Sequence, residues 1–163
     1  LVQGAGGGVA TAALVLGAAA GLRMFATSRD EAKRRRALEL GAEAAVPTGE
    51  RLPHRMDAVL ETVGAATWSH SVKSLRPGGT LVISGATSGP NPPAAELNRI
   101  FFLELKVVGS TMGSKEELAG LLHFCAAKGV RPVVDSVLPL DRAREGFEKM
   151  AGGDVFGKVV LTV

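Results

Sequence analysis

Short apolar runs alternate with segments of helical periodicity along the whole chain, and this alternation constrains the fold more than any other feature. Between the first two runs, for example, Val9, Ala13, Leu16 and Ala20 recur at helical spacing. Strands that alternate with helices form parallel sheets, because each helix carries the chain back to the same edge. We therefore predict an α/β domain with strands at Leu1–Gln3, Leu22–Thr27, Ala44–Val46, Asp57–Glu61, Thr80–Ser84 and Leu105–Gly109.

The first predicted strand runs into a glycine-rich turn, Gly4-Ala5-Gly6-Gly7-Gly8, directly before a helix. Glycine adopts positive φ and lets backbone N–H groups approach a pyrophosphate, and the helix N-terminus adds a partial positive charge. The strict G-x-G-x-x-G pattern is not met, but the frame Gly4-x-x-Gly7-x-x-Ala10 fits. The turn predicts a dinucleotide site on a Rossmann-type, doubly wound sheet of strand order 3-2-1-4-5-6. A tight strand–helix turn without a ligand is the alternative.

The end of the second predicted strand is where such a sheet reads the ribose of the cofactor. An acidic residue there would bind the 2′-hydroxyl of NAD, but the chain has Ser28 and Arg29 at this point. Asp30 falls in the first turn of the next helix, where it favours the helix dipole. Ser28, Arg29 and Lys33 are positioned for a 2′-phosphate, so NADP is expected rather than NAD. Surface solvation of the two cations is the alternative.

Helix ends also carry recognisable signals. Two capping boxes are predicted, one from Ser28 and Glu31 and one from Ser114 and Glu117. Asp141 is expected to cap the last helix. The residues expected to pack inside from the last two helices are Leu118, Leu121, Leu122, Cys125, Phe147 and Met150.

Composition excludes several classes of function. The single cysteine, Cys125, rules out an intrachain disulfide, and the three histidines lack metal-ligand spacing. The net charge is only +3, and the basic run Arg34–Arg36 lies in a helical pattern, so no nucleic-acid partner is expected. The stretch Gly4–Leu22 lacks the bulk of a membrane span, and no secretory leader is visible. A cytoplasmic location without membrane contact is expected.

Five segments in a specific order resemble the medium-chain dehydrogenase/reductase superfamily, in particular its zinc-type alcohol dehydrogenase and quinone reductase branches. Alanine at position 10 departs from the usual glycine, a change that is tolerated. The resemblance implies hydride transfer between a nicotinamide and a carbonyl, alcohol or quinone/enone substrate. The segments that carry it are Gly4–Val9, Glu39–Ala42, Asp57–Gly64, Leu75–Gly79 and Gly157–Leu161.

The resemblance also implies cofactor contacts at particular residues. Those implied around the pyrophosphate are Gly4, Gly7, Gly8 and Val9. Those implied to flank the adenosine side are Thr62, Val63 and Gly64. Those implied to line the nicotinamide are Gly85, Ala86, Thr87, Ser110, Thr111 and Met112. Lys158 is either a phosphate contact or a solvated lysine at a strand edge. No catalytic and no metal-binding residue is assigned within the chain.

The resemblance divides the chain into a cofactor-binding domain, residues 1–132, and a return segment, residues 133–163. In the resembled family the return segment rejoins a catalytic domain that precedes the cofactor-binding domain. That domain is not in this sequence, so the chain is expected to be a catalytically incomplete fragment, with zinc possible only in the missing domain. The bare edge of strand Leu105–Gly109 predicts a homodimer.

Two other functions remain open on sequence alone. One is an S-adenosylmethionine-dependent methyltransferase, in which the segment Leu75–Gly79 also recurs. That fold usually has an acidic residue at the end of its second strand, which this chain lacks. The other is a non-catalytic nucleotide-sensing domain, against which the closing strand Gly157–Val163 argues.

Overall fold

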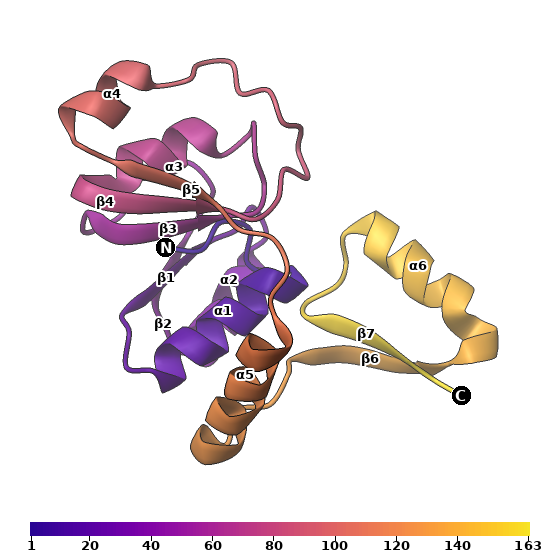
Figure 1. Cartoon of the computed structure of the whole chain (residues 1–163). Helices are drawn as coiled ribbons and strands as arrows, with labels where there is room; N and C mark the ends of the chain where they lie inside the picture. Colours follow the sequence, from indigo (N-terminus) through magenta and orange to yellow (C-terminus); the bar gives the residue numbers. More distant parts are fainter.

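The computed structural model describes residues 1–163 as an α/β body followed by a β–α–β return segment (Figure 1). The strands of the body are β1 (Met24–Thr27), β2 (Ala42–Val46), β3 (Met56–Glu61), β4 (Leu75–Ile83) and β5 (Lys106–Gly109). Its helices are α1 (Gly8–Ala19), α2 (Glu31–Glu39), α3 (Trp68–Ser74), α4 (Leu97–Phe102) and α5 (Lys115–Lys128). The return segment comprises β6 (Val134–Pro139), a 3₁₀ turn (Leu140–Arg142), α6 (Ala143–Gly152) and β7 (Lys158–Thr162).

Every strand pair in the structure is parallel, which confirms the α/β class. The strands fall into small sheets: β1 with β2, β3 with β4 and β5, and β6 with β7. Val2 makes parallel bridges to Ala26 and Leu60 and so lies between β1 and β3. The expected strand Leu1–Gln3 is thus present only as a bridge at Val2, although its backbone hydrogen-bonds to both β1 and β3.

The core of the body lies on both faces of these strands, since successive residues of a strand point to opposite sides. One cluster, packed beneath α3, consists of Leu1, Phe25, Leu52, Met56, Val59, Val72, Leu75 and Leu81. The other, beneath α1 and α2, consists of Val2, Ala5, Ala10, Leu14, Ala26, Ala37 and Ala42. The small side chains of the second cluster let the two helices lie close to the strands that carry the glycine turn.

Of the three predicted helix caps, the one at α5 is confirmed and those at α2 and α6 are wrong. Ser114 and Glu117 form the full capping box at the start of α5. At α2, however, the carboxylate of Asp30 accepts from the Lys33 N–H, and Ser28 is not the cap. The helix begins only at Glu31, so its cap is two residues later than expected. Asp141 likewise lies in the 3₁₀ turn, and Arg142 precedes α6.

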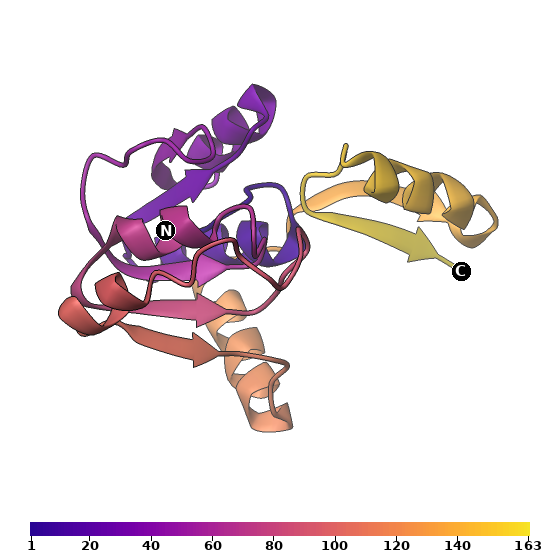
Figure 2. The same cartoon turned by 90° about the horizontal axis from the view of Figure 1, so that it is seen from above.

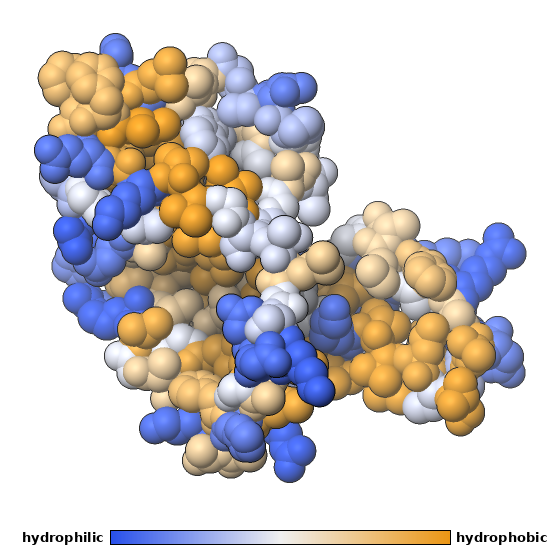
Figure 3. Space-filling view, viewed as in Figure 1, coloured by the Kyte–Doolittle hydropathy of each residue, from blue (hydrophilic) through white to orange (hydrophobic).

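The apolar faces of α5 and α6 were expected to be buried, and that expectation is wrong. Leu118, Leu122 and Phe147 are 56%, 60% and 65% exposed, because no element of this chain packs over them. Both helices project from the body when the molecule is seen from above (Figure 2). Apolar surface also gathers over the exposed Phe101 and Phe102 of α4 and over the return segment (Figure 3). No helix combines the length and the apolar content needed to cross a membrane.

Asp135 holds the return segment together from within. Its side chain is only 6% exposed, pairs with the Lys149 ammonium and accepts from the Phe156 N–H at 2.9 Å. Burial raises the pKa of this carboxyl, but Lys149 and the N–H group outweigh burial, so the pKa lies below its ordinary value. The neighbouring Gly157 donates its N–H to the Gly6 carbonyl at 2.8 Å. The return segment therefore contacts the glycine turn directly.

Candidate cofactor site

The glycine turn has the backbone that its sequence predicts. Gly4 and Gly6 take φ values of +72° and +118°, a region that side chains other than glycine rarely adopt. Gly7 caps α1 in an extended conformation, and no side chain caps the helix there. The first N–H groups of a helix have no partner within the helix, so the start of α1 offers unpaired donors together with the positive end of the helix dipole.

A cavity of about 880 Å³ lies beside this turn. It is bounded by the turn, the end of β1, the loops after β3 and β4, and the loop after α6. The structure therefore brings several predicted residues together at one place, beyond the carboxyl ends of the parallel strands. Those predicted residues are Gly4, Gly7, Ser28, Arg29, Lys33, Val63 and Thr87.

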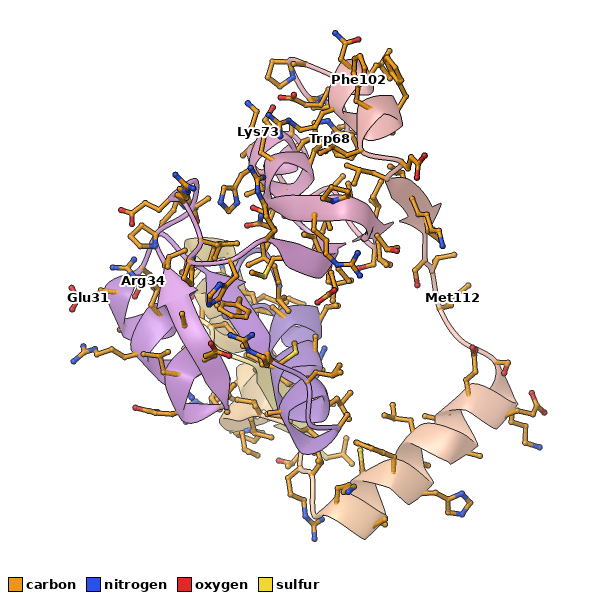
Figure 4. All side chains as sticks on the ribbon, turned by 90° about the vertical axis from the view of Figure 1, so that its left-hand side faces the viewer. Glu31, Arg34, Trp68, Lys73, Phe102 and Met112 are labelled. Atoms are coloured by element: carbon orange, nitrogen blue, oxygen red, sulfur yellow. The ribbon has the colours of Figure 1, made fainter.

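The end of the cavity formed by β1 and α2 carries both cations and carboxylates. Arg29 is exposed, whereas the Lys33 ammonium donates to the Gly153 carbonyl in the loop after α6. Arg34, labelled on α2 in Figure 4, donates to the Ser28 carbonyl at 2.8 Å. The Lys33 N–H lowers the pKa of Asp30, which keeps that carboxylate charged as the helix cap. Asp154 also lines this end of the cavity.

At the other end, the loops after β3 and β4 are joined by hydrogen bonds. The Ser88 N–H donates to the Val63 carbonyl at 2.7 Å, and the Ala65 N–H donates to the Gly89 carbonyl at 2.9 Å. Gly64 has a φ of +91°, and a Cβ there would lie 2.5 Å from the Gly89 oxygen. The predicted segments Thr62–Gly64 and Gly85–Thr87 therefore form one packed unit.

Other predicted residues lie outside the cavity. Ser110 stays beside β4, because its N–H donates to the Ile83 carbonyl at 2.8 Å, but Met112 is 95% exposed on the segment that leads to α5 (Figure 4). Thr111 lies on the same exposed segment. Gly8, Val9 and Lys158 line a separate apolar cavity of about 570 Å³, which α5 and the return segment also border.

Sequence reasoning missed two groups of residues here. The loop residues Gly152, Gly153 and Asp154 border the cavity, although no local signal links them to it. The polar residues Gln3 and Glu61 are fully buried, and they end the predicted strands Leu1–Gln3 and Asp57–Glu61. Their signal was present in the sequence, because a polar residue within an apolar run requires buried hydrogen-bond partners.

Comparison with known proteins identifies the family to which this geometry belongs. Residues 8–127 match the family described as zinc-binding dehydrogenase. The chain belongs to this zinc-binding dehydrogenase family. It is 33% identical to the zinc-type alcohol dehydrogenase-like protein YogA of Leptosphaeria maculans, covering 100% of this chain and 50% of that protein. It is 28% identical to the quinone oxidoreductase of Mus musculus, covering 99% of this chain and 54% of the relative. The chain thus spans about half the length of these relatives.

Solved structures of other proteins have the same fold. An NAD-dependent alcohol dehydrogenase superposes with a TM-score of 0.89 at 36% identity, covering 99% of this chain and 50% of that one. A cobalt- and zinc-bound alcohol dehydrogenase from Pyrobaculum aerophilum superposes with a TM-score of 0.87 at 27% identity, covering 99% and 49%. A mycobacterial protein complexed with NADPH shares the fold with a TM-score of 0.82 at 23% identity, covering 99% and 55%.

Proposed function

We propose that the chain is the cofactor-binding part of an NADP(H)-dependent oxidoreductase. The whole enzyme transfers hydride between nicotinamide and a carbonyl, alcohol or quinone/enone substrate. One observation carries the proposal: the glycine turn at the start of α1 opens into a cavity beyond the carboxyl ends of parallel strands, where such sheets bind dinucleotides. A doubly wound strand order of 3-2-1-4-5-6 agrees with the observed order of paired segments, which is β2, β1, Val2, β3, β4 and β5.

The residues present fit a dinucleotide. The cavity of about 880 Å³ has the size of ordinary ligand sites. Gly4, Gly7 and the N-terminus of α1 would hold the pyrophosphate. The loop Thr62–Gly64 would flank the adenosine side, and the loop Gly85–Thr87 would border the nicotinamide. Gly8, Val9, Ser110, Thr111, Met112 and Lys158 remain proposed contacts. The bound nicotinamide supplies the hydride chemistry, while the chain binds it and orients it.

The proposed cofactor is NADP rather than NAD. Ser28 and Arg29 border the cavity at the end of β1, where an acidic residue would oppose a 2′-phosphate. Of the carboxylates that line this end of the cavity, Asp30 is already engaged as the cap of α2. The NADPH complex of a protein with the same fold supports this assignment, whereas the NAD-dependent relative argues for testing it.

The proposed enzyme needs a catalytic domain in addition to the residues of this chain. We assign residues 1–132 to cofactor binding and residues 133–163 to a return segment that packs on a catalytic domain. Zinc, bound in one relative, would belong to that domain. The isolated chain should therefore not consume NADPH when a quinone or an aldehyde is added, and a longer protein that contains it should. This is checked by following the nicotinamide absorbance. Metal-independent turnover by the chain alone would overturn the division.

The exposed edge of β5 is the proposed contact in a homodimer. All four residues of β5 are exposed, and its outer side pairs with no other strand. Val107→Pro removes an N–H from this edge and should convert a dimer to a monomer, which light scattering would measure. Val137→Pro, in the middle of β6, is the control, because it makes the same substitution away from the edge of β5. An unchanged dimer in the Val107 variant would rule this edge out.

A further inference from the structure

A second cavity, of about 610 Å³, lies between the loop that joins β2 to β3 and the helices α3 and α4. It shares no lining residue with the cavity beside the glycine turn. No carboxylate lines it, whereas most of its lining residues carry basic side chains. These basic residues are Arg51, His54, Arg55, His70, Lys73 and Arg99. We refer to this space as the basic cavity.

The loop that forms one wall of the basic cavity is fixed to α3 at both ends. His70 Nδ1 lies 2.9 Å from Gln3 Nε2, which can only donate, so Nδ1 accepts and Nε2 carries the ring proton. That Nε2 donates to the Glu50 carbonyl at 2.8 Å, at the start of the loop. At the other end, Arg55 donates to the Lys73 carbonyl. The wall is therefore held in place by the protein itself, and both nitrogens of His70 are engaged within it.

The remaining cations of the basic cavity outnumber the carboxylates that pair with them. Lys73 forms an ion pair with Glu96 at 3.2 Å. Arg51, Arg55 and Arg99 take part in no salt bridge. A guanidinium has several N–H donors, so the single bond from Arg55 to a carbonyl leaves others free. Like charges that line one cavity repel each other, and an anion bound among them would relieve that repulsion.

We propose that the basic cavity is a second anion site, which binds a small molecule that carries linked phosphate groups. A guanidinium presents its N–H donors in a planar fork that matches phosphate oxygens, and Arg51, Arg55 and Arg99 all line this one cavity. Linked phosphates can contact several of these groups at once, whereas a single phosphate contacts fewer. No Phe, Tyr or Trp lines the cavity, so it offers no ring on which the bases of a nucleic acid would stack. The site does not depend on the proposed dinucleotide binding.

Calorimetric titration with inorganic pyrophosphate tests the proposal. We expect saturable binding, and weaker binding of inorganic monophosphate. Arg51→Gln and Arg99→Gln should each weaken pyrophosphate binding by about tenfold or more, because each removes charge-assisted hydrogen bonds. Arg35→Gln is the matched control, since it makes the same change of charge at an exposed position of α2 that lines neither cavity. It should leave pyrophosphate binding unchanged.

Gly7→Asp separates the basic cavity from the glycine turn, because it places a carboxylate at the turn and changes no residue of the basic cavity. Pyrophosphate binding that survives Gly7→Asp and weakens in Arg51→Gln supports the second site, whether or not the protein binds NADPH. Binding that Gly7→Asp abolishes, or that Arg35→Gln weakens equally, would overturn it. So would the absence of saturable binding, or tighter binding of a short RNA that requires the same arginines. A failure to bind NADPH would refute the proposed function alone.

Discussion

Gly7→Asp is expected to weaken NADPH binding by about a thousandfold while leaving the protein at least as stable as the parent. Gly7 has an ordinary φ of −67°, and a Cβ there would lie 3.9 Å from its nearest neighbour, the Gly4 oxygen. An aspartate therefore fits without strain. It would also supply the side-chain cap that α1 lacks, a gain of a few tenths of a kcal/mol over glycine.

The expected loss of binding follows from the charge. A carboxylate about 4 Å from the pyrophosphate costs roughly 4 kcal/mol at an effective dielectric constant of about 20, which corresponds to about a thousandfold. Gly7→Asn is the matched control, because it caps the helix and has nearly the same size without the charge. Calorimetry would measure affinity, and urea unfolding would measure stability. Equal affinities of the Asp and Asn variants would show that no phosphate binds at this turn.

The unmodified protein is expected to bind NADPH more tightly than NADH by about 10- to 10⁴-fold. One or two charge-assisted contacts to the 2′-phosphate supply a difference of this size. Lys33 already donates to the Gly153 carbonyl, so Arg29 is the freer cation and should contribute more. Because Arg29 is exposed, added salt should reduce the preference.

Arg29→Ala separates the contributions of the two cations. It should remove most of the preference for NADPH and leave NADH binding unchanged. Arg35→Ala, at an exposed position of α2 that does not line the cavity, serves as the control. An unchanged preference in Arg29→Ala would transfer the role to Lys33 or Ser28. Equal or tighter binding of NADH by the parent would reject the NADP assignment.

Local features of the sequence predicted the local structure well. The conformation of the glycine turn depends only on its own residues and on the start of α1. The capping box of Ser114 and Glu117 is likewise complete within four positions of sequence. The cap of α2 was predicted wrongly, because Ser28 and Asp30 are both residue types that cap helices, and only Ser28 has a glutamate three residues later. The choice between them depends on where β1 ends, and that is set by its pairing with β2.

Features that depend on distant residues could not be predicted in this way. The contact between Lys33 and Gly153 spans 120 residues of sequence, and it brings the loop after α6 to the cavity. The apolar stripe of α5 indicates a helix correctly, but periodicity does not say whether another element covers it. Glu61 ends the predicted strand Asp57–Glu61, but its sequence position does not reveal its partners. Only three-dimensional packing places four hydrogen-bond donors around its carboxylate.

The central claim is that this chain binds a nicotinamide dinucleotide at the glycine turn. Calorimetric titration of the purified protein with NADPH, and separately with S-adenosylmethionine, tests it most directly. We expect saturable binding of NADPH that the Gly7→Asp substitution removes, and no heat from S-adenosylmethionine. Binding of S-adenosylmethionine in place of NADPH, or NADPH binding that Gly7→Asp leaves intact, would contradict the claim.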